Sequence, residues 1–213
     1  MQAERKVINM SYIDISVGDF TKALASKTAT PGGGSAAALV GALAASLSAM
    51  VCALTLGKEK YAQYENEVSD ILGRAQMLRA QLALMIDGDA QAFEPLSMTY
   101  VIPKENPKRA QLMENALRTA AAAPLETLRL TCAVVELHAC ALGKTSQLAI
   151  SDIGTGAAFC KSAMQGSAMN VKVNTALMAD RACAETIDAE VRALLEKYIP
   201  IADVVYARVW EML

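Results

Sequence analysis

A run of 22 residues without any charged side chain, from Ser35 to Leu56, constrains the fold of this chain more than any other feature. It directly follows three successive glycines, Gly32 to Gly34, and it ends just before the charged segment GKEKY. Three kinds of structure could contain such a run. It could be a membrane-spanning helix, a phosphate-binding loop with the helix that follows it, or a core helix whose first turn serves a binding site.

The composition of the run argues against a membrane span, although its length is sufficient to cross a bilayer. Eight of its residues are Ala, three are Ser and only five are Leu, so the free energy gained by insertion is small. No second run of this kind exists in the sequence, and we expect no membrane partner. Because small residues let neighbouring helices approach closely, the run predicts a central, buried helix.

Neither glycine-containing segment matches the nucleotide-binding pattern Gly-x-x-x-x-Gly-Lys-Ser/Thr. The turn PGGGS has no lysine after its glycines, and GKT at residues 143–145 has His138 in place of the first glycine. Glycines still permit close approach of a ligand, and here they lead to a helix N-terminus with unpaired N–H groups. The candidates for binding a polar or anionic group are therefore Gly32, Gly33, Gly34 and Ser35. A tight crossing of two helices would need the same small residues.

Apolar residues make up 54% of the chain and aromatic residues only 5%, which favours close-packed helices over sheets. The chain has no Gly/Ser-rich linker and no repeat of fixed period, so residues 1–213 are predicted to form a single all-α domain, a bundle of about six to nine helices. Predicted caps are Ser16, Asp152 and Gly57. The expected helices span residues 17–27, 35–56, 61–100, 107–142 with a kink or break at Pro124, 152–178, 180–198 and 201–213.

Charge and cysteine content exclude several classes of protein. The formal net charge is −2 and no run of Lys and Arg is interleaved with aromatic residues, so we expect no nucleic-acid partner. The five cysteines are odd in number and form no Cys-x-x-Cys pair, so neither a disulfide framework nor a zinc site is predicted. Free cysteines, and the lack of an apolar leader in the opening MQAERKVINM, predict a cytoplasmic location.

One acidic residue falls on the apolar face of a predicted helix. The apolar stripe recurs at steps of three and four residues and consists of Ile71, Ala75, Leu78, Leu82, Met85, Phe93, Leu96 and Tyr100. Asp89 lies on this stripe, whereas Asp87 is turned about 200° away from it. A buried carboxyl group with a raised pKa can exchange protons in general acid/base catalysis. Asp89 is therefore a candidate catalytic residue, and equally a candidate structural residue bonded to a neighbouring helix terminus or an inward lysine.

Other polar residues give less specific signals. His138, the only histidine, lies in an apolar segment and is predicted to be a core or interface residue. No Ser/His/Asp arrangement for nucleophilic catalysis can be assembled from the sequence. The Glu-x-x-His pattern of metal-binding bundles is absent, so no metal is expected. Asp152, Asn170 and Asn174 belong to a strip of small and polar residues along one predicted helix. Such a strip could line a cavity or let two helices pack closely.

Six motifs together carry a resemblance to a known family. They are TPGGGS (30–35), GKEKY (57–61), DGDAQAF (87–93), PK (103–104), SDIGTGAA (151–158) and GSAMNVKVN (166–174). In this order and spacing the chain resembles the formimidoyltetrahydrofolate cyclodeaminase domain and its relatives, the stand-alone bacterial methenyltetrahydrofolate cyclohydrolases. The likeness extends from about Val17 to the C-terminal helices. The segment GKTSQLAI (143–150) and Thr175 depart from the family pattern, which affects the shape of the expected cleft more than the fold.

The resemblance implies an all-α homodimer that binds a reduced folate in a cleft near the subunit interface, with the tetrahydrofolate derivative as substrate and no further cofactor. Asp89 matches the family's acid/base aspartate. The resemblance also implies folate contacts from the glycine turn and from Lys58, Lys104, Asp152 and Asn170.

The implied reactions take place at the carbon that bridges N5 and N10 of tetrahydrofolate. Asp89 would be the general acid/base either in hydrolysis of 5,10-methenyltetrahydrofolate or in release of ammonia from 5-formimidoyltetrahydrofolate, with Lys58 and Lys104 attracting the carboxylates of the folate tail. The sequence contains no formimino-transferring domain, which favours the cyclohydrolase. The alternative from another class is a non-catalytic folate-binding or scaffold protein of the same fold.

Overall fold

The computed structural model describes residues 11–213. The first ten residues, on which the expected lack of a signal peptide depends, lie outside the described part. The described residues are helical and contain no strand, as predicted. The elements are α1 (Val17–Leu24), α2 (Gly33–Ala53), the 3-10 helix η1 (Glu59–Tyr64), α3 (Glu65–Tyr100), α4 (Arg109–Ala141), the 3-10 helix η2 (Gln147–Ala149), α5 (Ile150–Thr175) and α6 (Arg181–Met212).

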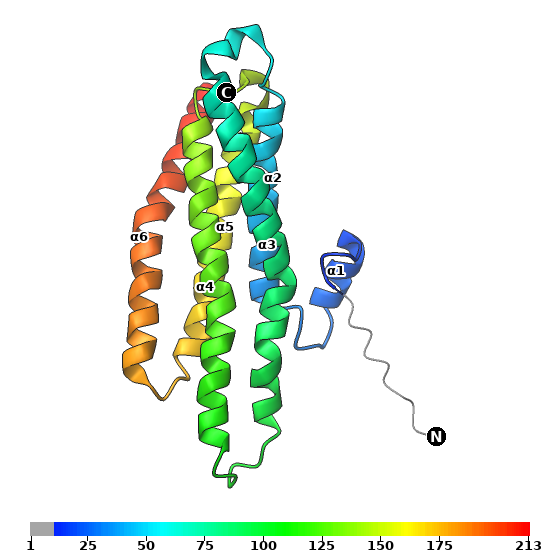
Figure 1. The fold of residues 1–213 in the computed structure, drawn as a ribbon, viewed down its shortest axis with the longest axis vertical. Helices are drawn as coiled ribbons and strands as arrows, with labels where there is room; N and C mark the ends of the chain where they lie inside the picture. Colours follow the sequence, from blue (N-terminus) through cyan, green and yellow to red (C-terminus); the bar gives the residue numbers. More distant parts are fainter. Residues whose placement is uncertain (1–10) are drawn as a thin grey trace.

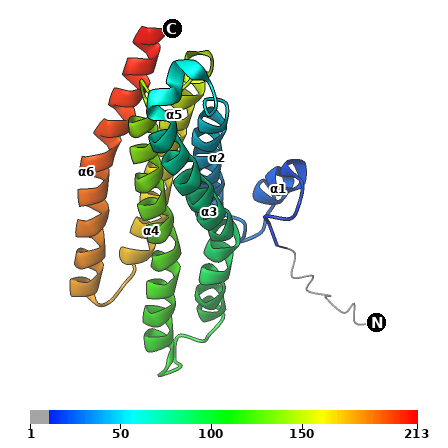
Figure 2. The same ribbon diagram turned by 45° about the horizontal axis from the view of Figure 1, so that its top comes forward.

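The five long helices, α2 to α6, run alternately up and down in one bundle, and α1 lies beside it near the start of α2 (Figures 1 and 2). Helix α2 packs against α3, α5 and α4, which confirms that the uncharged run is a core helix. Its small residues are needed there: a Cβ added to Gly41 would lie 3.0 Å from the Thr131 hydroxyl oxygen and 3.1 Å from a Leu82 methyl. Among the described helices α2 alone has the length and apolarity to cross a membrane, and half of its most apolar window is buried in the bundle.

Prolines do not divide the long helices. Pro124 lies inside α4 and Pro200 lies inside α6, where a break was predicted. A proline removes one backbone hydrogen bond and bends a helix, but it does not end one whose two halves both bury an apolar face. Figure 1 shows the bend of α6 in its second half, where the colour passes from orange to red.

The predicted helix caps have mixed outcomes. Ser16 caps α1 as expected, because its Oγ accepts the Asp19 N–H at 3.0 Å. The prediction for Asp152 is wrong: η2 leads directly into α5, which begins at Ile150, so Asp152 lies within the first turn. Helix α2 ends at Ala53, and Gly57 has the left-handed φ of 74° in the turn that follows rather than at the helix end.

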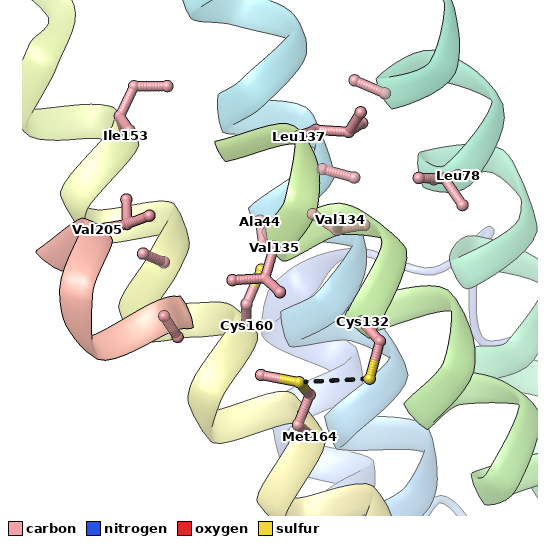
Figure 3. Close-up of a cluster of buried hydrophobic side chains, with 14 of the residues drawn as sticks. Ala44, Leu78, Cys132, Val134, Val135, Leu137, Ile153, Cys160, Met164 and Val205 are labelled. Atoms are coloured by element: carbon pink, nitrogen blue, oxygen red, sulfur yellow. Dashed lines mark hydrogen bonds between the residues drawn. The ribbon is translucent and has the colours of Figure 1, made fainter. Parts of the chain in front are cut away.

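The main core lies between α2, α3, α4, α5 and α6 and is built largely from Ala, Val, Leu, Ile and Cys (Figure 3). Each fully buried Val, Leu or Ile side chain contributes roughly 1.5–3 kcal/mol through the hydrophobic effect. Cys132 and Cys160 belong to this core, and Cys132 Sγ lies 3.6 Å from the sulfur of Met164 (Figure 3). Burial raises the pKa of Cys132 to about 12, so its thiol is unreactive, as expected of a buried cysteine.

Candidate functional site

Asp89 reaches from α3 to the first turn of α2. Its Oδ2 accepts hydrogen bonds from the Ser35 backbone N–H at 2.8 Å and from the Ser35 hydroxyl at 3.2 Å. The residue at the N-cap of α2, Gly32, has no side chain to make such a bond. The Asp89 carboxylate therefore replaces the missing cap, and its negative charge is placed at the positive end of the helix dipole.

The surroundings of Asp89 favour a protonatable carboxyl group. Burial opposes ionisation and the two Ser35 hydrogen bonds favour it; burial prevails, so the pKa of Asp89 lies above its ordinary value. Among the described residues no lysine or arginine forms an ion pair with Asp89, and none donates a hydrogen bond to Oδ1. One carboxylate oxygen is thus held in place while the other is left to interact with a ligand.

Two glycines of the turn lie in close contact with side chains of other helices. A Cβ added to Gly34 would lie 2.0 Å from Asp89 Oδ1, and one added to Gly33 would lie 3.0 Å from Asn170 Nδ2. The first distance is far below any van der Waals contact, so only glycine at position 34 lets the carboxylate lie against the start of α2. The turn therefore serves both interpretations left open by the sequence, close helix packing and ligand access.

A pocket of about 140 Å³ opens beside this carboxylate. It lies where α2, α3, α4 and α5 meet the turn that precedes α2. Its lining combines apolar side chains with a few polar groups, as small-molecule sites do. The residues that line it are Ala29, Thr30, Gly32, Gly33, Asp89, Phe93, Ala120, Asn170, Val173 and Asn174.

Two asparagines of α5 line this pocket, and each uses its amide nitrogen to bond backbone carbonyls. Asn170 Nδ2 donates to the Gly166 carbonyl at 2.8 Å, and Asn174 Nδ2 donates to the carbonyls of Asn170 and Ala120 at 2.8 and 3.2 Å. A carbonyl oxygen only accepts, so these bonds fix which side of each amide carries the nitrogen. The amide oxygens remain as acceptors, and both residues line the same pocket as Asp89. The polar part of the pocket therefore suits a ligand that carries N–H donors or a positive charge.

The structure brings together some of the predicted site residues and separates others. Gly32, Gly33, Gly34, Ser35, Asp89 and Asn170 meet at one end of α2. Lys58 follows α2 at its other end, about 30 Å away at 1.5 Å per residue, and its Nζ donates to Ser146 Oγ at 3.1 Å. Asp152 is in the first turn of α5, about 27 Å along that helix from Asn170. Lys104 is exposed in the connection between α3 and α4.

Some lining residues were not predicted as site residues. Asn174 lies one helical turn after Asn170 on α5, so the strip of polar residues in the sequence already contained the signal for it. Phe93 likewise follows Asp89 by four residues on α3. Thr30 and Val173 carried no such signal, because their place in the pocket depends on how the turn and α5 pack.

His138 is a core residue, as predicted. It is fully buried, its Nε2 lies 3.1 Å from the Ala44 carbonyl oxygen, and Gly156 leaves the space that its ring occupies. Burial lowers the pKa of His138 to about 4, so the ring is neutral and Nε2 carries the proton that it shares with Ala44. The ring lies in the core and does not line the pocket beside Asp89.

Comparison with known proteins places most of this chain in one family. A family model for formiminotransferase-cyclodeaminase matches residues 16–193. A methenyltetrahydrofolate cyclohydrolase from Methylorubrum extorquens is 36% identical over 194 residues, which cover 89% of this chain and 93% of that protein. A formimidoyltransferase-cyclodeaminase from Mus musculus is 32% identical over 195 residues, which cover 88% of this chain and 35% of that protein. The crystal structure of a formiminotetrahydrofolate cyclodeaminase from Thermotoga maritima superposes with a TM-score of 0.80 at 26% identity, covering 94% of this chain and 96% of that one.

Proposed function

Because this chain belongs to the formiminotransferase-cyclodeaminase family, we propose that it is an enzyme of folate one-carbon metabolism that acts on the carbon bridging N5 and N10 of tetrahydrofolate. The reaction is that of a 5,10-methenyltetrahydrofolate cyclohydrolase or a 5-formimidoyltetrahydrofolate cyclodeaminase. The first is favoured, because the cyclohydrolase relative is 36% identical to this chain, against 32% for the mouse relative and 26% for the Thermotoga maritima cyclodeaminase. The chain spans about a third of the mouse relative. Both reactions use the folate as substrate and need no metal or further cofactor.

One observation carries this proposal: Asp89 is held in a small pocket by Ser35, with a raised pKa, no cationic partner among the described residues and one oxygen free. In the cyclohydrolase reaction, water adds to the positively charged methenyl carbon, and Asp89 removes a proton from that water to leave a hydroxyl group on the carbon. The C–N5 bond then breaks as the hydroxyl oxygen becomes the formyl carbonyl and its proton passes to N5, which gives 10-formyltetrahydrofolate. The Asp89 carboxylate and the oxygens of Asn170 and Asn174 favour the cationic substrate in the same pocket.

The cyclodeaminase reaction uses the same carboxyl group in its protonated form. N10 attacks the formimino carbon on N5 and its proton passes to the formimino nitrogen. Asp89 gives that nitrogen a second proton, so that it leaves as ammonia and the 5,10-methenyl cation forms. General acid/base catalysis of either kind contributes about 10²- to 10⁴-fold to the rate. The two reactions therefore require opposite starting protonation states of Asp89.

The pocket also bears on the proposed homodimer. At about 140 Å³ it is smaller than the roughly 300–1,000 Å³ of pockets that enclose a whole drug-sized ligand, so it holds only the reacting part of a folate. The outward face of α2, between α3 and α5, leaves Leu43, Met50 and Leu54 each 40–50% exposed. A second copy covering this face would extend the cleft. Lys58 and Asp152 would reach the pocket only from such a second subunit, packed antiparallel, because their own subunit holds them at the opposite end.

The test is an absorbance assay of the purified protein without detergent, in which we expect it to stay soluble. Loss of the methenyl band from 5,10-methenyltetrahydrofolate shows cyclohydrolase activity. Appearance of that band together with ammonia from 5-formimidoyltetrahydrofolate shows cyclodeaminase activity. The limb of the pH–rate profile that reports Asp89 should rise with pH for the hydrolysis, in which it acts as a base, and fall with pH for the deamination.

Folate binding without turnover of either substrate would contradict an enzyme and support the alternative, a non-catalytic folate-binding protein. Activity in both assays would assign both reactions to one site. A cytoplasmic location remains a prediction, which fractionation of cells expressing the full chain would test.

A further inference from the structure

Asp87, two residues before Asp89, binds a different part of the chain. Its Oδ2 accepts the hydroxyl hydrogen of Ser11 at 2.5 Å, and its Oδ1 accepts the backbone N–H of Tyr12 at 2.6 Å. Both oxygens are therefore used to hold residues 11–24, the segment that contains α1 and that we call the N-terminal arm. Hydrogen bonds to a charged acceptor are stronger than neutral ones, and these two join positions 75 and 76 residues apart.

The arm is also fixed by apolar contacts with the bundle. Phe20 of α1 is buried against Ala38 of α2 and Ile86 of α3. The ring of Tyr12 meets that of Phe20 edge to face, with centroids 6.3 Å apart. The Asp87 hydrogen bonds thus set the position of Tyr12 at the edge of a small cluster that rests on the same two helices as the pocket.

Tyr12 connects the arm to the pocket itself. Its hydroxyl group lies 3.2 Å from Thr30 Oγ1, and Thr30 lines the pocket beside Asp89. The glycine turn of residues 31–34 is therefore held at both ends by contacts that lead to Asp87 and Asp89. Asp89 bonds Ser35 just after the turn, and Asp87 acts through the arm and Tyr12 on Thr30 just before the glycines.

We propose that Asp87 is a positioning residue for the pocket: by anchoring Ser11 and Tyr12 it fixes Thr30 and the wall of the turn against which the substrate binds. Asp87 itself does not line the pocket. Its effect on catalysis rests on the proposed function, whereas its effect on the turn does not. The motif DGDA thus carries a reacting residue and a positioning residue, and the helix directs the two carboxylates to different partners.

The test combines steady-state kinetics on 5,10-methenyltetrahydrofolate with hydrogen-exchange mass spectrometry of the full chain. Asp87→Ala releases the arm, and we expect KM to rise about tenfold and kcat to fall less, because a displaced wall weakens substrate positioning. Asp87→Asn should restore KM to within about threefold, because its amide oxygen still accepts the Tyr12 N–H. Tyr12→Phe keeps the ring and removes only the link to Thr30, so KM should rise severalfold while Tm stays unchanged.

The control is Lys22→Ala, on the exposed face of α1, where Asp19 is its one ion-pair partner among residues 11–213. It should change neither KM nor the hydrogen exchange of residues 29–35. Backbone amides of residues 29–35 should exchange faster in Asp87→Ala and in Tyr12→Phe than in wild type. Faster exchange of residues 29–35 in Asp87→Ala, with unchanged exchange in Lys22→Ala, supports the proposal. This holds even if the wild-type protein converts neither folate, because that result would contradict only the proposed function.

Unchanged exchange of residues 29–35 in Asp87→Ala would overturn the proposal. So would faster exchange combined with wild-type KM in an active enzyme, since Asp87 would then hold the arm without shaping the site. An equal loss of Tm and activity in Asp87→Asn and Asp87→Ala would assign Asp87 to stability alone.

Discussion

Asp89 and Asp188 are two inward-facing carboxylates near the same end of the bundle, and they are held in opposite ways. Asp188 of α6 is 7% exposed, is paired with Lys172 of α5 and accepts the Thr175 hydroxyl at 2.6 Å. Asp89 of α3 is bonded only by Ser35 and has no cation beside it among the described residues. One carboxylate is neutralised and the other is not.

The pKa directions follow from this difference. Burial opposes ionisation of Asp188, but the hydrogen bonds from Lys172 and Thr175 outweigh it and hold its pKa below the ordinary value. Burial of Asp89 prevails over its bonds to Ser35, and its pKa is raised. A paired carboxylate stays ionised and joins α5 to α6, whereas an unpaired one next to a pocket can gain and lose a proton.

The largest expected effect comes from exchanging the carboxyl group of each residue for an amide. Asp89→Asn should reduce kcat for the folate that the wild-type protein converts by about 10²- to 10⁴-fold, because an amide cannot exchange a proton. The protein should stay folded, because the amide oxygen can still accept the Ser35 N–H. Asp188→Asn is the matched control and should retain kcat within about twofold per folded molecule, since it faces α5 rather than the pocket. Equal losses in the two variants would remove the distinction between them.

A glycine exchange tests the contact that places Asp89. Gly34→Ala should reduce kcat/KM by about 10²-fold, because its Cβ would displace Oδ1 from a position 2.0 Å away. Gly73→Ala, also within a helix but with open space around the added Cβ, should leave activity unchanged and stabilise the protein by about 0.5–1 kcal/mol. Wild-type kinetics in Gly34→Ala would show that the carboxylate does not need its observed place.

The free energy of unfolding should respond in the reverse order, with a larger loss from substitution of Asp188 than from substitution of Asp89. Asp188→Ala should lower the free energy of unfolding by about 1–2 kcal/mol, because buried Thr175 loses its acceptor and Lys172 loses its partner. Lys172 is largely exposed, which limits the loss. Asp89→Asn should change the unfolding free energy by less than about 0.5 kcal/mol or raise it. Urea titrations at neutral pH measure both, and a larger loss in Asp89→Asn would contradict the comparison.

The smallest expected effect is on the pH dependence of the free energy of unfolding. The lowered pKa of Asp188 contributes stability that is present above its unfolded-state value of about 3.9 and is lost as pH falls through the folded pKa. The raised pKa of Asp89 has the opposite sign: it costs stability at neutral pH, and the cost decreases as pH falls through the folded pKa and is gone below the unfolded-state value of about 3.9. Asp188→Asn should flatten the acid loss of stability, and Asp89→Asn should steepen it.

The sequence predicted the all-α fold and the inward position of Asp89 because both depend on local periodicity. A 3.6-residue period places Asp89 on the apolar stripe of α3, and small residues without charge predict a core helix in α2. A bond from Asp89 to a helix terminus was one of the two interpretations, but the period could not predict that this terminus is the one at Ser35, because that contact joins positions 54 residues apart. The same limit applies to Asp87, whose partners Ser11 and Tyr12 gave no signal in the sequence.

Membership of a motif did not indicate how far apart the predicted site residues lie within one subunit. Lys58 and Asp152 belong to motifs that resemble the family, yet helices of fixed rise carry them about 30 Å from Asp89 in the same subunit. The predicted break at Pro200 was wrong because burial of residues on both sides of the proline, such as Val191 and Val205, outweighs the tendency of proline to end a helix.

A direct titration of both carboxyl groups tests the central claim, that Asp89 alone is poised to exchange a proton. Carbon-13 NMR of the side-chain carboxyls of the full-length protein would give the two pKa values, with signals assigned from Asp89→Asn and Asp188→Asn. We expect Asp89 to titrate above the ordinary aspartate value of about 3.9 and Asp188 below it. An Asp89 that titrates at or below the value for Asp188 would contradict it.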